Sequence, residues 1–461
     1  MTWKYLQKLF SDRSCPPDSV QTRTNNPKFK VVVVDFYDNA SNRGAINFAN
    51  ALKQCEGIDA DIYDENFDHS FLNLESRKIF DLIDTGQTIL QQTAADVIIW
   101  GYRENDIIRL NFQNRMLYDE NENSFVSLMD SFYLPAAILD EENPEIPPEL
   151  MLLLYGIVIS AVNNPDNEYR IYKKFLLKKI VHNLSQMDSA QSLGLGDTPY
   201  VFNFLGIIYL SLAYDSPYDS DFKIIHSLFE SALKYQEKIV QPTHLGCIYY
   251  HLGQLYNCAA RNLNRQSAHY FKPAIKNYQI AQKFFSKYTY PYDYGYVCYK
   301  LSELYASYWK QTEDIQALRD AVFQLREAEK IYTQVLFPDF WGQIEGRLGY
   351  LLNNLGNLTK NREIYDLAIK AYQNRQKIIT EKRQPVQWAE IQEKIGNMYY
   401  ILGRNYHDLS AAEEAFSCFH DALYIHENEC NSLQIKRLKT DIAKAAQTIE
   451  ELKKVAVFDS F

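Results

Sequence analysis

Polar and charged side chains lie at the end of the first long apolar run of the chain and directly after it. The run is Phe29–Phe36, and the group comprises Asp35, Tyr37, Asp38, Asn39, Ser41, Asn42 and Arg43. Because α/β domains bind ligands beyond the carboxyl ends of their strands, these side chains could hold a small ligand or a nucleotide. The same residue types form Asx turns, and Ser41 or Asn42 could cap the next helix. Neither of the glycine-rich phosphate-binding motifs occurs in the sequence, which favours the capping interpretation.

Other residues of chemically active types lack the partners that metal binding or catalysis requires. His244 and His251 are seven residues apart and could share a helix face, whereas His420 and His426 are six apart. Neither pair has a third ligand at metal-binding spacing. The cysteines form no CxxC pair, and no Gly-x-Ser-x-Gly motif or Cys–His arrangement marks a nucleophile. We therefore predict no enzymatic activity, no metal and no cofactor.

Composition and charge restrict the kinds of partner. The net charge of −10 argues against nucleic acid, because phosphate binding requires a basic surface. No apolar run approaches the roughly 18–20 residues that span a bilayer. The segment Met1–Phe10 could form a short amphipathic helix, but peripheral membrane contact is not the favoured interpretation. Seven scattered cysteines indicate a reducing compartment, and we predict a cytoplasmic location.

An internal repeat is the strongest signal in the sequence. The small residues Gly206, Gly253, Ser302, Gly349 and Gly396 are successively 47, 49, 47 and 47 residues apart. Further columns share this period: Ala274, Ala321, Ala368 and Ala415 in one, and Pro242, Pro291, Pro338 and Pro385 in another. The single spacing of 49 predicts a two-residue insertion between Cys258 and Ala274. A fixed period of this length indicates a repeat architecture.

Each repeat has the pattern of two amphipathic helices. In one unit the first helix is expected from Val386 to about Leu402, and the second from about Leu409 to His426. Small residues in both helices would let the two backbones approach closely. Proline would open the next unit, since it suits the first turn of a helix but not its interior.

These repeats resemble the tetratricopeptide motif, in which Leu-Gly-x2-Tyr is followed by Ala-x3-Phe-x2-Ala. Ile395-Gly396-x2-Tyr399 and Ala415-x3-Phe419-x2-Ala422 carry the resemblance over about residues 195–430. The present unit of 47 residues exceeds the usual length of about 34, as in long bacterial variants. We expect the additional residues partly in the inter-helix loop, such as Leu402–Asp408, and partly in longer helices.

The resemblance implies a concave face, lined by the first helix of each unit, that binds a protein or peptide. The residues that it places there are Tyr200, Asn203, Tyr250, Gln254, Asn257, Tyr296, Tyr299, Glu303, Gln343, Tyr350, Asn353, Asn354, Glu390, Glu393, Asn397 and Tyr400. Tyrosines and amides suit contacts with a peptide backbone, although any of these tyrosines could instead pack between units. Because the set contains no Lys or Arg, we expect a neutral or basic partner.

The N-terminal region changes from helical to strand periodicity. Strands are expected at 29–36, 58–63, 96–102, 107–113 and 125–132, with helices at 42–55 and 75–93, which predicts an α/β domain with a mixed sheet. Val31–Phe36, Ala94–Gly101 and Ile107–Leu110 resemble the TolB amino-terminal and FlgO-type α/β domains of bacteria. That resemblance implies a docking module without catalytic residues.

The sequence thus predicts an α+β, mostly α protein in which a helical solenoid follows an α/β domain. The expected division is a leader (1–28), a docking domain (29–135), a linker (136–148), helical repeats (149–431) and a capping helix with a tail (432–461). Within the repeats, 149–194 is divergent, and units follow at 195–241, 242–290, 291–337, 338–384 and 385–431. We expect a bacterial-type scaffold or adaptor that binds protein. The alternative is a sensor whose α/β domain binds a metabolite or nucleotide.

Overall fold

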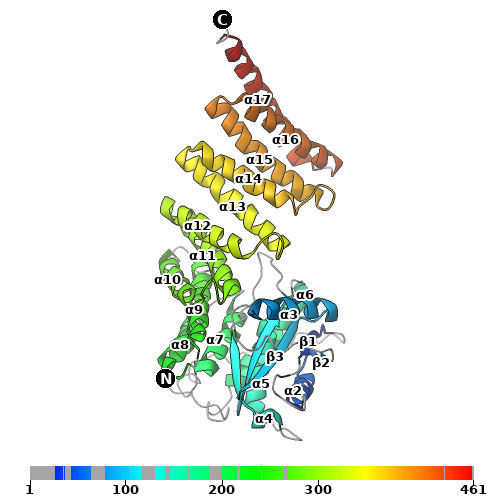
Figure 1. Ribbon diagram of the computed structural model, residues 1–461, viewed down its shortest axis with the longest axis vertical. Helices are drawn as coiled ribbons and strands as arrows, with labels where there is room; N and C mark the ends of the chain where they lie inside the picture. The colour runs from blue at the N-terminus through cyan, green and yellow to red at the C-terminus, as the bar shows by residue number, and fades with distance from the viewer. Residues whose placement is uncertain are drawn as a thin grey trace. The chain divides into compact units, whose positions relative to one another are not determined.

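A computed structural model describes most of the chain (Figure 1). The described residues are 26–34, 36, 43–63, 78–104, 106–115, 130–140, 146–164, 166–185, 199–214, 219–239, 241–262, 268–429 and 431–458. The chain forms two compact units, Met1–Val297 and Cys298–Phe461. Each unit is described by itself.

A five-stranded mixed sheet lies in the first unit. Its strands are β1 (Phe29–Val33), β2 (Ile58–Ile62), β3 (Val97–Glu104), β4 (Ile107–Asn114) and β5 (Ser131–Pro135), and its helices are α2 (Arg43–Lys53) and α3 (Lys78–Thr93). The strand order is β2-β1-β3-β4-β5; β1 runs parallel to β2 and β3, whereas β4 pairs antiparallel with β3 and β5. The predicted mixed sheet and order of elements are confirmed. The fifth strand begins at Ser131 and not at Phe125, which lies outside the described residues.

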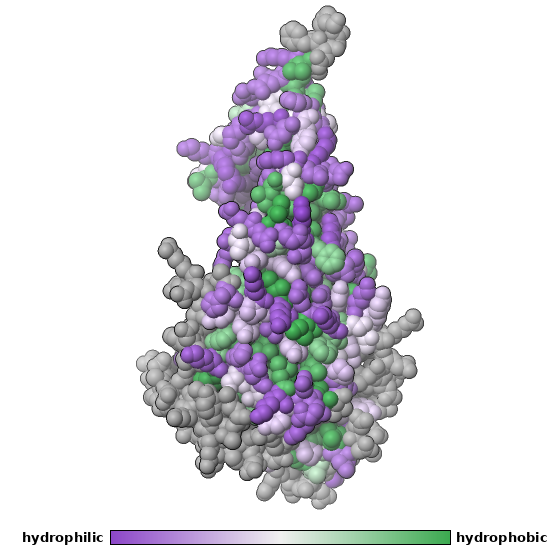
Figure 2. Space-filling view, turned by 90° about the vertical axis from the view of Figure 1, so that its left-hand side faces the viewer, coloured by the Kyte–Doolittle hydropathy of each residue, from purple (hydrophilic) through white to green (hydrophobic). Residues whose placement is uncertain are grey.

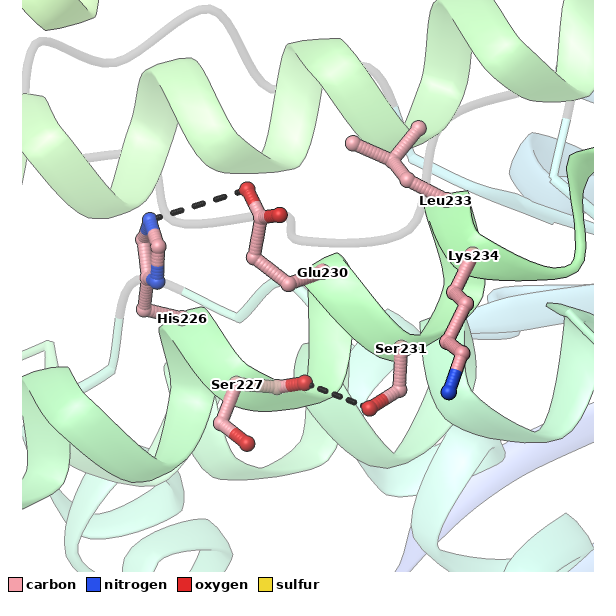
Figure 3. Close-up of a pocket in the computed structure, with 6 residues that line it drawn as sticks. All are labelled: His226, Ser227, Glu230, Ser231, Leu233 and Lys234. Carbon is pink, nitrogen blue, oxygen red and sulfur yellow. Dashed lines mark hydrogen bonds and ion pairs between the residues drawn. The ribbon is translucent and has the colours of Figure 1, made fainter. Parts of the chain in front are cut away.

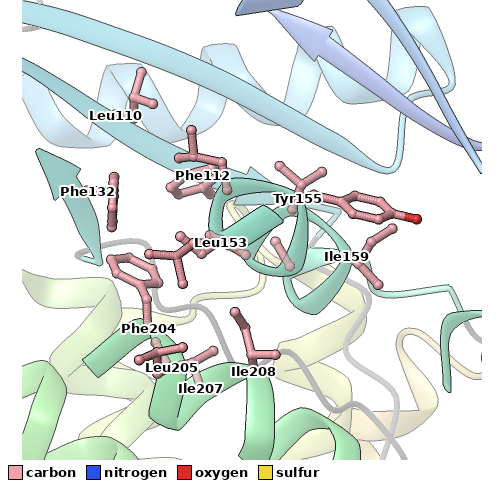
Figure 4. Close-up of a cluster of buried hydrophobic side chains, with 14 of the residues drawn as sticks. Leu110, Phe112, Phe132, Leu153, Tyr155, Ile159, Phe204, Leu205, Ile207 and Ile208 are labelled. Atoms are coloured by element: carbon pink, nitrogen blue, oxygen red, sulfur yellow. The ribbon is translucent and has the colours of Figure 1, made fainter. Parts of the chain in front are cut away.

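Both faces of the sheet are covered. Val32 and Ile98 point to one face and pack with Leu90 of α3. The alternate residues of the strands point to the other face, where Figure 4 shows Phe112 and Phe132 above Leu153 and Phe204 of two repeat helices. Burial on both faces explains why Val31, Val32 and Val33 of β1 form a continuous apolar run. The apolar core extends without a break from the strands to Cys258, across the predicted boundaries at residues 135 and 148.

Helix pairs make up the rest of the chain. The first and second helices of successive pairs are α5 (Pro148–Ala161) and α6 (Asn167–Ser185), α7 (Pro199–Ala213) and α8 (Asp219–Lys234), α9 (Pro242–Asn262) and α10 (Ala268–Phe284), α11 (Pro291–Thr312) and α12 (Ile315–Ile331), α13 (Pro338–Thr359) and α14 (Arg362–Gln376), and α15 (Pro385–Tyr406) and α16 (Leu409–Asn428). A short α4 (Ala137–Asp140), a 3-10 helix η3 (Gln236–Lys238) and a final α17 (Ser432–Phe458) complete the described elements. A proline opens every first helix, as the repeat predicts. The α+β, mostly α fold class is confirmed.

The loop between the two helices of a pair is shorter than expected. In the last pair α15 continues to Tyr406, and His407 ends it in the left-handed conformation with φ of 54°. The next residue, Asp408, caps α16 by accepting a hydrogen bond from the Ala411 N–H at 3.0 Å. The expectation of a seven-residue loop at Leu402–Asp408 is therefore wrong. The caps Asp314, Asn361 and Asp408 recur every 47 residues and could have marked these boundaries.

Glycines allow the two helices of a pair to approach closely. A Cβ atom added at Gly206, Gly253, Gly349 or Gly396 would lie 2.5, 2.7, 2.7 or 2.8 Å from an atom of the facing ring, which belongs to Phe229, Tyr278, Tyr372 or Phe419. The ring follows the glycine by 23 residues, except in the pair of α9 and α10, where it follows by 25. The predicted insertion of two residues thus falls between Gly253 and Tyr278.

The last repeat holds the C-terminal helix through a buried carboxylate. Glu393 of α15 accepts a hydrogen bond at 3.0 Å from His426 Nε2 of α16 and forms an ion pair with Arg437 of α17. Phe419 and Ala422 pack with Leu438 and Ala445 in the same region. α17 therefore covers the apolar face of the final pair, as expected of a capping helix.

Substitution of Gly349 tests the close contact. We expect Gly349→Ala to lower the free energy of unfolding by about 1–3 kcal/mol, because the Tyr372 ring must move. Gly342→Ala in the same helix is the matched control. A Cβ atom added at Gly342 would lie 3.1 Å from its nearest neighbour, Ile378. The gain in helix propensity of up to about 1 kcal/mol offsets the cost of that contact. Guanidinium unfolding, monitored by circular dichroism, measures both variants. Equal midpoints would contradict the close contact of Gly349 with Tyr372.

Candidate functional site

The first candidate site of the sequence lies almost entirely outside the described residues. Asp35, Tyr37, Asp38, Asn39, Ser41 and Asn42 are not described, and Arg43 is the first residue of α2. The interpretations of this segment as a ligand site and as a helix cap both stay predictions.

In the first unit, predicted concave-face residues contact the chain's own sheet. The Tyr200 ring of α7 lies 4.6 Å from the Tyr133 ring of β5. One turn later, the Asn203 amide donates a hydrogen bond to Asp130 Oδ1 at 3.1 Å. The start of β5 therefore occupies the surface that the sequence assigned to a partner in this repeat.

A buried hydrogen-bond network continues from Asp130 into α9. Asp130 Oδ2 lies 2.9 Å from Nε2 of His251, whose side chain is 0% exposed. His251 Nδ1 lies 2.9 Å from Gln254 Oε1, and Gln254 Nε2 donates to the Tyr250 hydroxyl at 3.1 Å. Burial raises the pKa of Tyr250 well above its ordinary value, so this hydroxyl keeps its proton. The network fixes β5 to the second and third helix pairs.

The remaining predicted residues of this unit lie beside the network. Asn257 is buried, and the Tyr296 ring lies 6.3 Å from the Tyr250 ring. The structure thus brings Tyr200, Asn203, Tyr250 and Gln254 together, but in packing between the sheet and the repeats. The sequence could not pair them with Asp130 or Tyr133, because these residues are far away along the chain.

In the second unit, the predicted residues differ in exposure. Tyr299 is buried with its ring 4.9 Å from Phe340, and Glu303 accepts ion pairs from Lys300 at 3.1 Å and Arg347 at 2.9 Å. Gln343, Asn353, Asn354 and Tyr400 are half-buried. Tyr350, Glu390 and Asn397 are exposed, and Glu393 belongs to the contact with α17. Open positions therefore concentrate on α13 and α15.

Basic residues that the sequence reasoning missed accompany these positions. Lys300, Arg347 and Lys394 are 47 residues apart, and each precedes the small residue of its motif by two. Arg347 lies over the Tyr299 ring at 4.9 Å, and Lys394 over the Tyr372 ring at 5.8 Å. Their period was visible in the sequence. This surface therefore carries charges of both signs.

A buried carboxyl group lies inside the same unit. Glu345 of α13 is fully buried. Burial raises its pKa to about 8, and the adjacent Glu329 carboxyl adds to this shift, whereas Asn374 and Arg326 oppose it. Glu345 is therefore mostly protonated at neutral pH.

A depression of about 640 Å³ lies along α8 in the first unit (Figure 3). Its lining residues are His226, Ser227, Glu230, Ser231, Leu233 and Lys234. His226 lies 3.8 Å from Glu230, and the Ser231 hydroxyl donates to the backbone oxygen of Ser227 at 2.8 Å. His226 Nε2 also lies 3.0 Å from the Tyr256 hydroxyl of α9, so this histidine joins α8 to α9.

In the described part of the chain, no three His, Cys, Asp or Glu side chains are grouped closely enough to hold a metal ion. His251 contacts Asp130 and Gln254, whereas His244 lies against the rings of Tyr133 and Tyr200. None of the described helices combines the length and the hydrophobicity of a membrane span.

The Asp130–His251 contact is testable by stability. We expect Asp130→Ala to lower the free energy of unfolding by about 2–5 kcal/mol, because His251 loses its buried partner. Asp61→Ala is the control. Asp61 is 56% exposed and pairs with Lys53 at 3.4 Å, so its loss should cost about 0–1 kcal/mol. Urea unfolding measures both changes, and similar values would refute the structural role of the network.

Glu345 predicts a pH dependence of stability. The unfolded chain releases this proton near the ordinary value of about 4.5, whereas the folded protein retains it to about 8. Between these values the folded state binds more protons, so stability falls as pH rises through this window. We expect Glu345→Gln to remove this component.

The measurement is the melting temperature from about pH 5 to about pH 9. The advantage of Glu345→Gln over the wild type should grow up to about pH 8 and then stay constant. Glu413→Gln, an exposed carboxylate beside Lys453, should run parallel to the wild type. Parallel curves for all three proteins would contradict the shifted pKa.

Comparisons with known proteins do not show a family. No protein-family model matches the chain. No curated protein matches it either. Among solved structures, the chain is similar to the crystal structure of BtubC (BKLC) from P. vanneervenii. The identity is 18%, 50% of this chain and 83% of that chain are covered, and the TM-score is 0.35. A similarity this distant carries no argument about function.

Proposed function

We propose that this protein is a non-catalytic scaffold or adaptor that binds a protein or peptide segment along the first helices α13 and α15. The observation that supports this most directly is the presence of Tyr350, Glu390 and Asn397 as exposed side chains on those two helices. In the first unit, the predicted residues Tyr200 and Asn203 contact Tyr133 and Asp130 of the chain itself. The second unit therefore offers the accessible part of the predicted surface.

The side chains on α13 and α15 suit a peptide segment. Tyr350 is 40% exposed and provides a ring face, with Lys310 at 5.2 Å from its centroid. Asn397 provides an amide that can pair with an extended backbone. On the face shown in Figure 2, apolar residues form several groups among hydrophilic ones. We therefore expect a partner to be held by aromatic anchors that polar residues surround.

The charge of the partner is a further part of the proposal. The predicted set contains no cation, which favours a neutral or basic partner, but basic residues lie on the same kind of helix. Lys300 shares α11 with Glu303, Lys394 shares α15 with Glu390, and Arg347 lies on α13. We therefore propose a segment of mixed charge with at least one aromatic or aliphatic anchor.

Several finer predictions belong to this proposal. They are the tetratricopeptide family, the TolB or FlgO-type docking role of the sheet, the bacterial type and the cytoplasmic location. The helix pairs with glycine–aromatic contacts support a tetratricopeptide-like repeat. The absence of enzymatic activity is also a prediction.

Paired variants test the proposed surface. We expect Tyr350→Ala with Asn397→Ala to reduce the capture of specific partners by the full chain about tenfold or more, because a central aromatic anchor is lost. The control is Phe323→Ala with Tyr424→Ala, which removes rings that are 61% and 62% exposed on the second helices α12 and α16. Quantitative mass spectrometry of cell-extract captures compares both variants with the wild type.

The outcome distinguishes the two helix sets. Partners lost from the α13–α15 variant but kept by the control would support the proposal, provided that both variants retain the wild-type circular dichroism. Equal capture by all three proteins, or loss only in the control, would refute binding along the first helices. A substitution of Tyr299 would not test binding alone, because its ring packs against Phe340 and its loss would also lower stability.

A further inference from the structure

The helix pair of α9 and α10 lies in a stretch of the chain that has no acidic residue. Between Glu237 and Asp293 the sequence contains seven Lys or Arg residues and neither Asp nor Glu, although the whole chain has a net charge of −10. Every other second helix, namely α6, α8, α12, α14 and α16, contains at least one Asp or Glu. The positive charge of this pair is therefore not balanced within it, in contrast to the other repeats.

The lysines of α10 lie on one exposed stripe of the helix. Lys272, Lys276 and Lys283 are all exposed, whereas the stripe that contains Ala274 and Tyr278 is buried. Spacings of four and seven residues place the three ammonium groups on the same face of the helix. At about 1.5 Å per residue, they extend over about 17 Å.

These lysines have no acidic partner within the chain. Among the residues that the structure describes, no carboxylate pairs with Lys272, Lys276 or Lys283. On α12, by contrast, Lys330 pairs with Glu327. Like charges four residues apart repel each other, so Lys272 and Lys276 oppose the stability of their own helix. An anion beside the stripe would remove this repulsion.

The extent of the stripe favours a short anionic partner. The neighbouring second helix α8 contacts α10 through Phe222 and Tyr270, whose ring centroids are 5.2 Å apart, and it carries Glu230, which is 56% exposed. A nucleic acid or an anionic membrane would extend over such a carboxylate, and the net charge of −10 would repel it. An extended peptide of about six residues covers the length of the stripe and stays on α10.

The geometry of an extended acidic segment matches the stripe. Carboxylates at alternate positions of such a segment are about 6.4–6.8 Å apart. The helical rise between Lys272 and Lys276 is about 6 Å. Tyr288 follows the helix and is 76% exposed, with Nζ of Lys287 5.2 Å from its ring centroid. This ring can contact an apolar residue at one end of the segment.

We propose that the exposed stripe of Lys272, Lys276 and Lys283 on α10 is a docking surface for an acidic segment of a partner protein, in addition to the surface proposed on α13 and α15. Carboxylates of the segment pair with the three ammonium groups. Because each pair is exposed, the contact is a sum of weak interactions and weakens with salt.

Two rhodamine-labelled peptides test this surface on the full chain. One alternates Glu and Ser over about ten residues, and the other has Gln in place of every Glu. In fluorescence anisotropy at about 50 mM NaCl, we expect the Glu peptide to bind about tenfold or more tightly than the Gln peptide, because only carboxylates pair with the lysines. Raising NaCl to about 300 mM should weaken the binding of the Glu peptide several-fold.

Variants of equal net charge locate the contact. The triple variant Lys272→Gln, Lys276→Gln, Lys283→Gln should bind the Glu peptide about tenfold more weakly. The control is the triple variant Lys370→Gln, Lys382→Gln, Lys436→Gln, which removes three exposed lysines of the second unit and the same total charge. Its affinity should stay within about twofold of the wild type, because salt screens distant charges.

The outcomes separate an acidic peptide from other anions. Loss of affinity confined to the α10 variant supports the proposal. No binding of the Glu peptide, equal binding of both peptides, or equal losses in the two triple variants would overturn it. Tighter binding of an oligothymidylate than of the Glu peptide, lost in the α10 variant, would also overturn it, because the stripe would then serve nucleic acid.

A measurement on the wild type decides if the α10 variant loses its circular dichroism signal. Carbodiimide couples a carboxylate of the bound Glu peptide to a lysine ammonium group within contact distance, and mass spectrometry identifies the lysine. Cross-links concentrated on Lys272, Lys276 and Lys283 would support the docking surface. Cross-links spread evenly over the exposed lysines, or found only elsewhere, would refute it.

Discussion

The close approach of a glycine to an aromatic ring determines how the pairs α7–α8, α9–α10, α13–α14 and α15–α16 pack. Gly349 and Gly396 leave no room for a Cβ atom beside Tyr372 and Phe419. The ring fills the volume that a side chain on the first helix would otherwise take, which brings the two backbones together. Since this contact recurs with the period of the sequence, the two helices of each of these pairs pack through the same kind of contact.

The N-terminal sheet changes the use of those equivalent positions. One face of the sheet is apolar and packs on α5 and α7, as Phe132 and Phe204 illustrate at 5.4 Å between ring centroids. This packing brings the start of β5 against α7 and α9, where Asp130 and Tyr133 engage the side chains that an isolated repeat would offer to a partner. Residues predicted for the concave face thus pack within the chain in the first unit, whereas several of them stay accessible on α13 and α15 in the second.

Buried polar groups are handled in two different ways. Asp130, His251 and Gln254 satisfy one another, so their network stabilises a unique arrangement of sheet and repeats. Asn111 Oδ1 and both ring nitrogens of His244 are instead buried without a hydrogen-bond partner, which costs free energy of folding.

The repeat, the helix pairs and the mixed sheet could be predicted from the sequence, because these depend on local periodicity and on prolines and small residues at fixed spacing. The caps Asp314, Asn361 and Asp408 and the column of Lys300, Arg347 and Lys394 are also periodic in the sequence. The contact of Tyr200 with β5, the hydrogen bond of Asn203 to Asp130 and the burial of Glu345 beside Glu329 depend on tertiary packing. These relations join residues far apart in the chain, and no periodicity encodes such contacts, since they arise from the way the sheet packs on the repeats and neighbouring helices pack on one another.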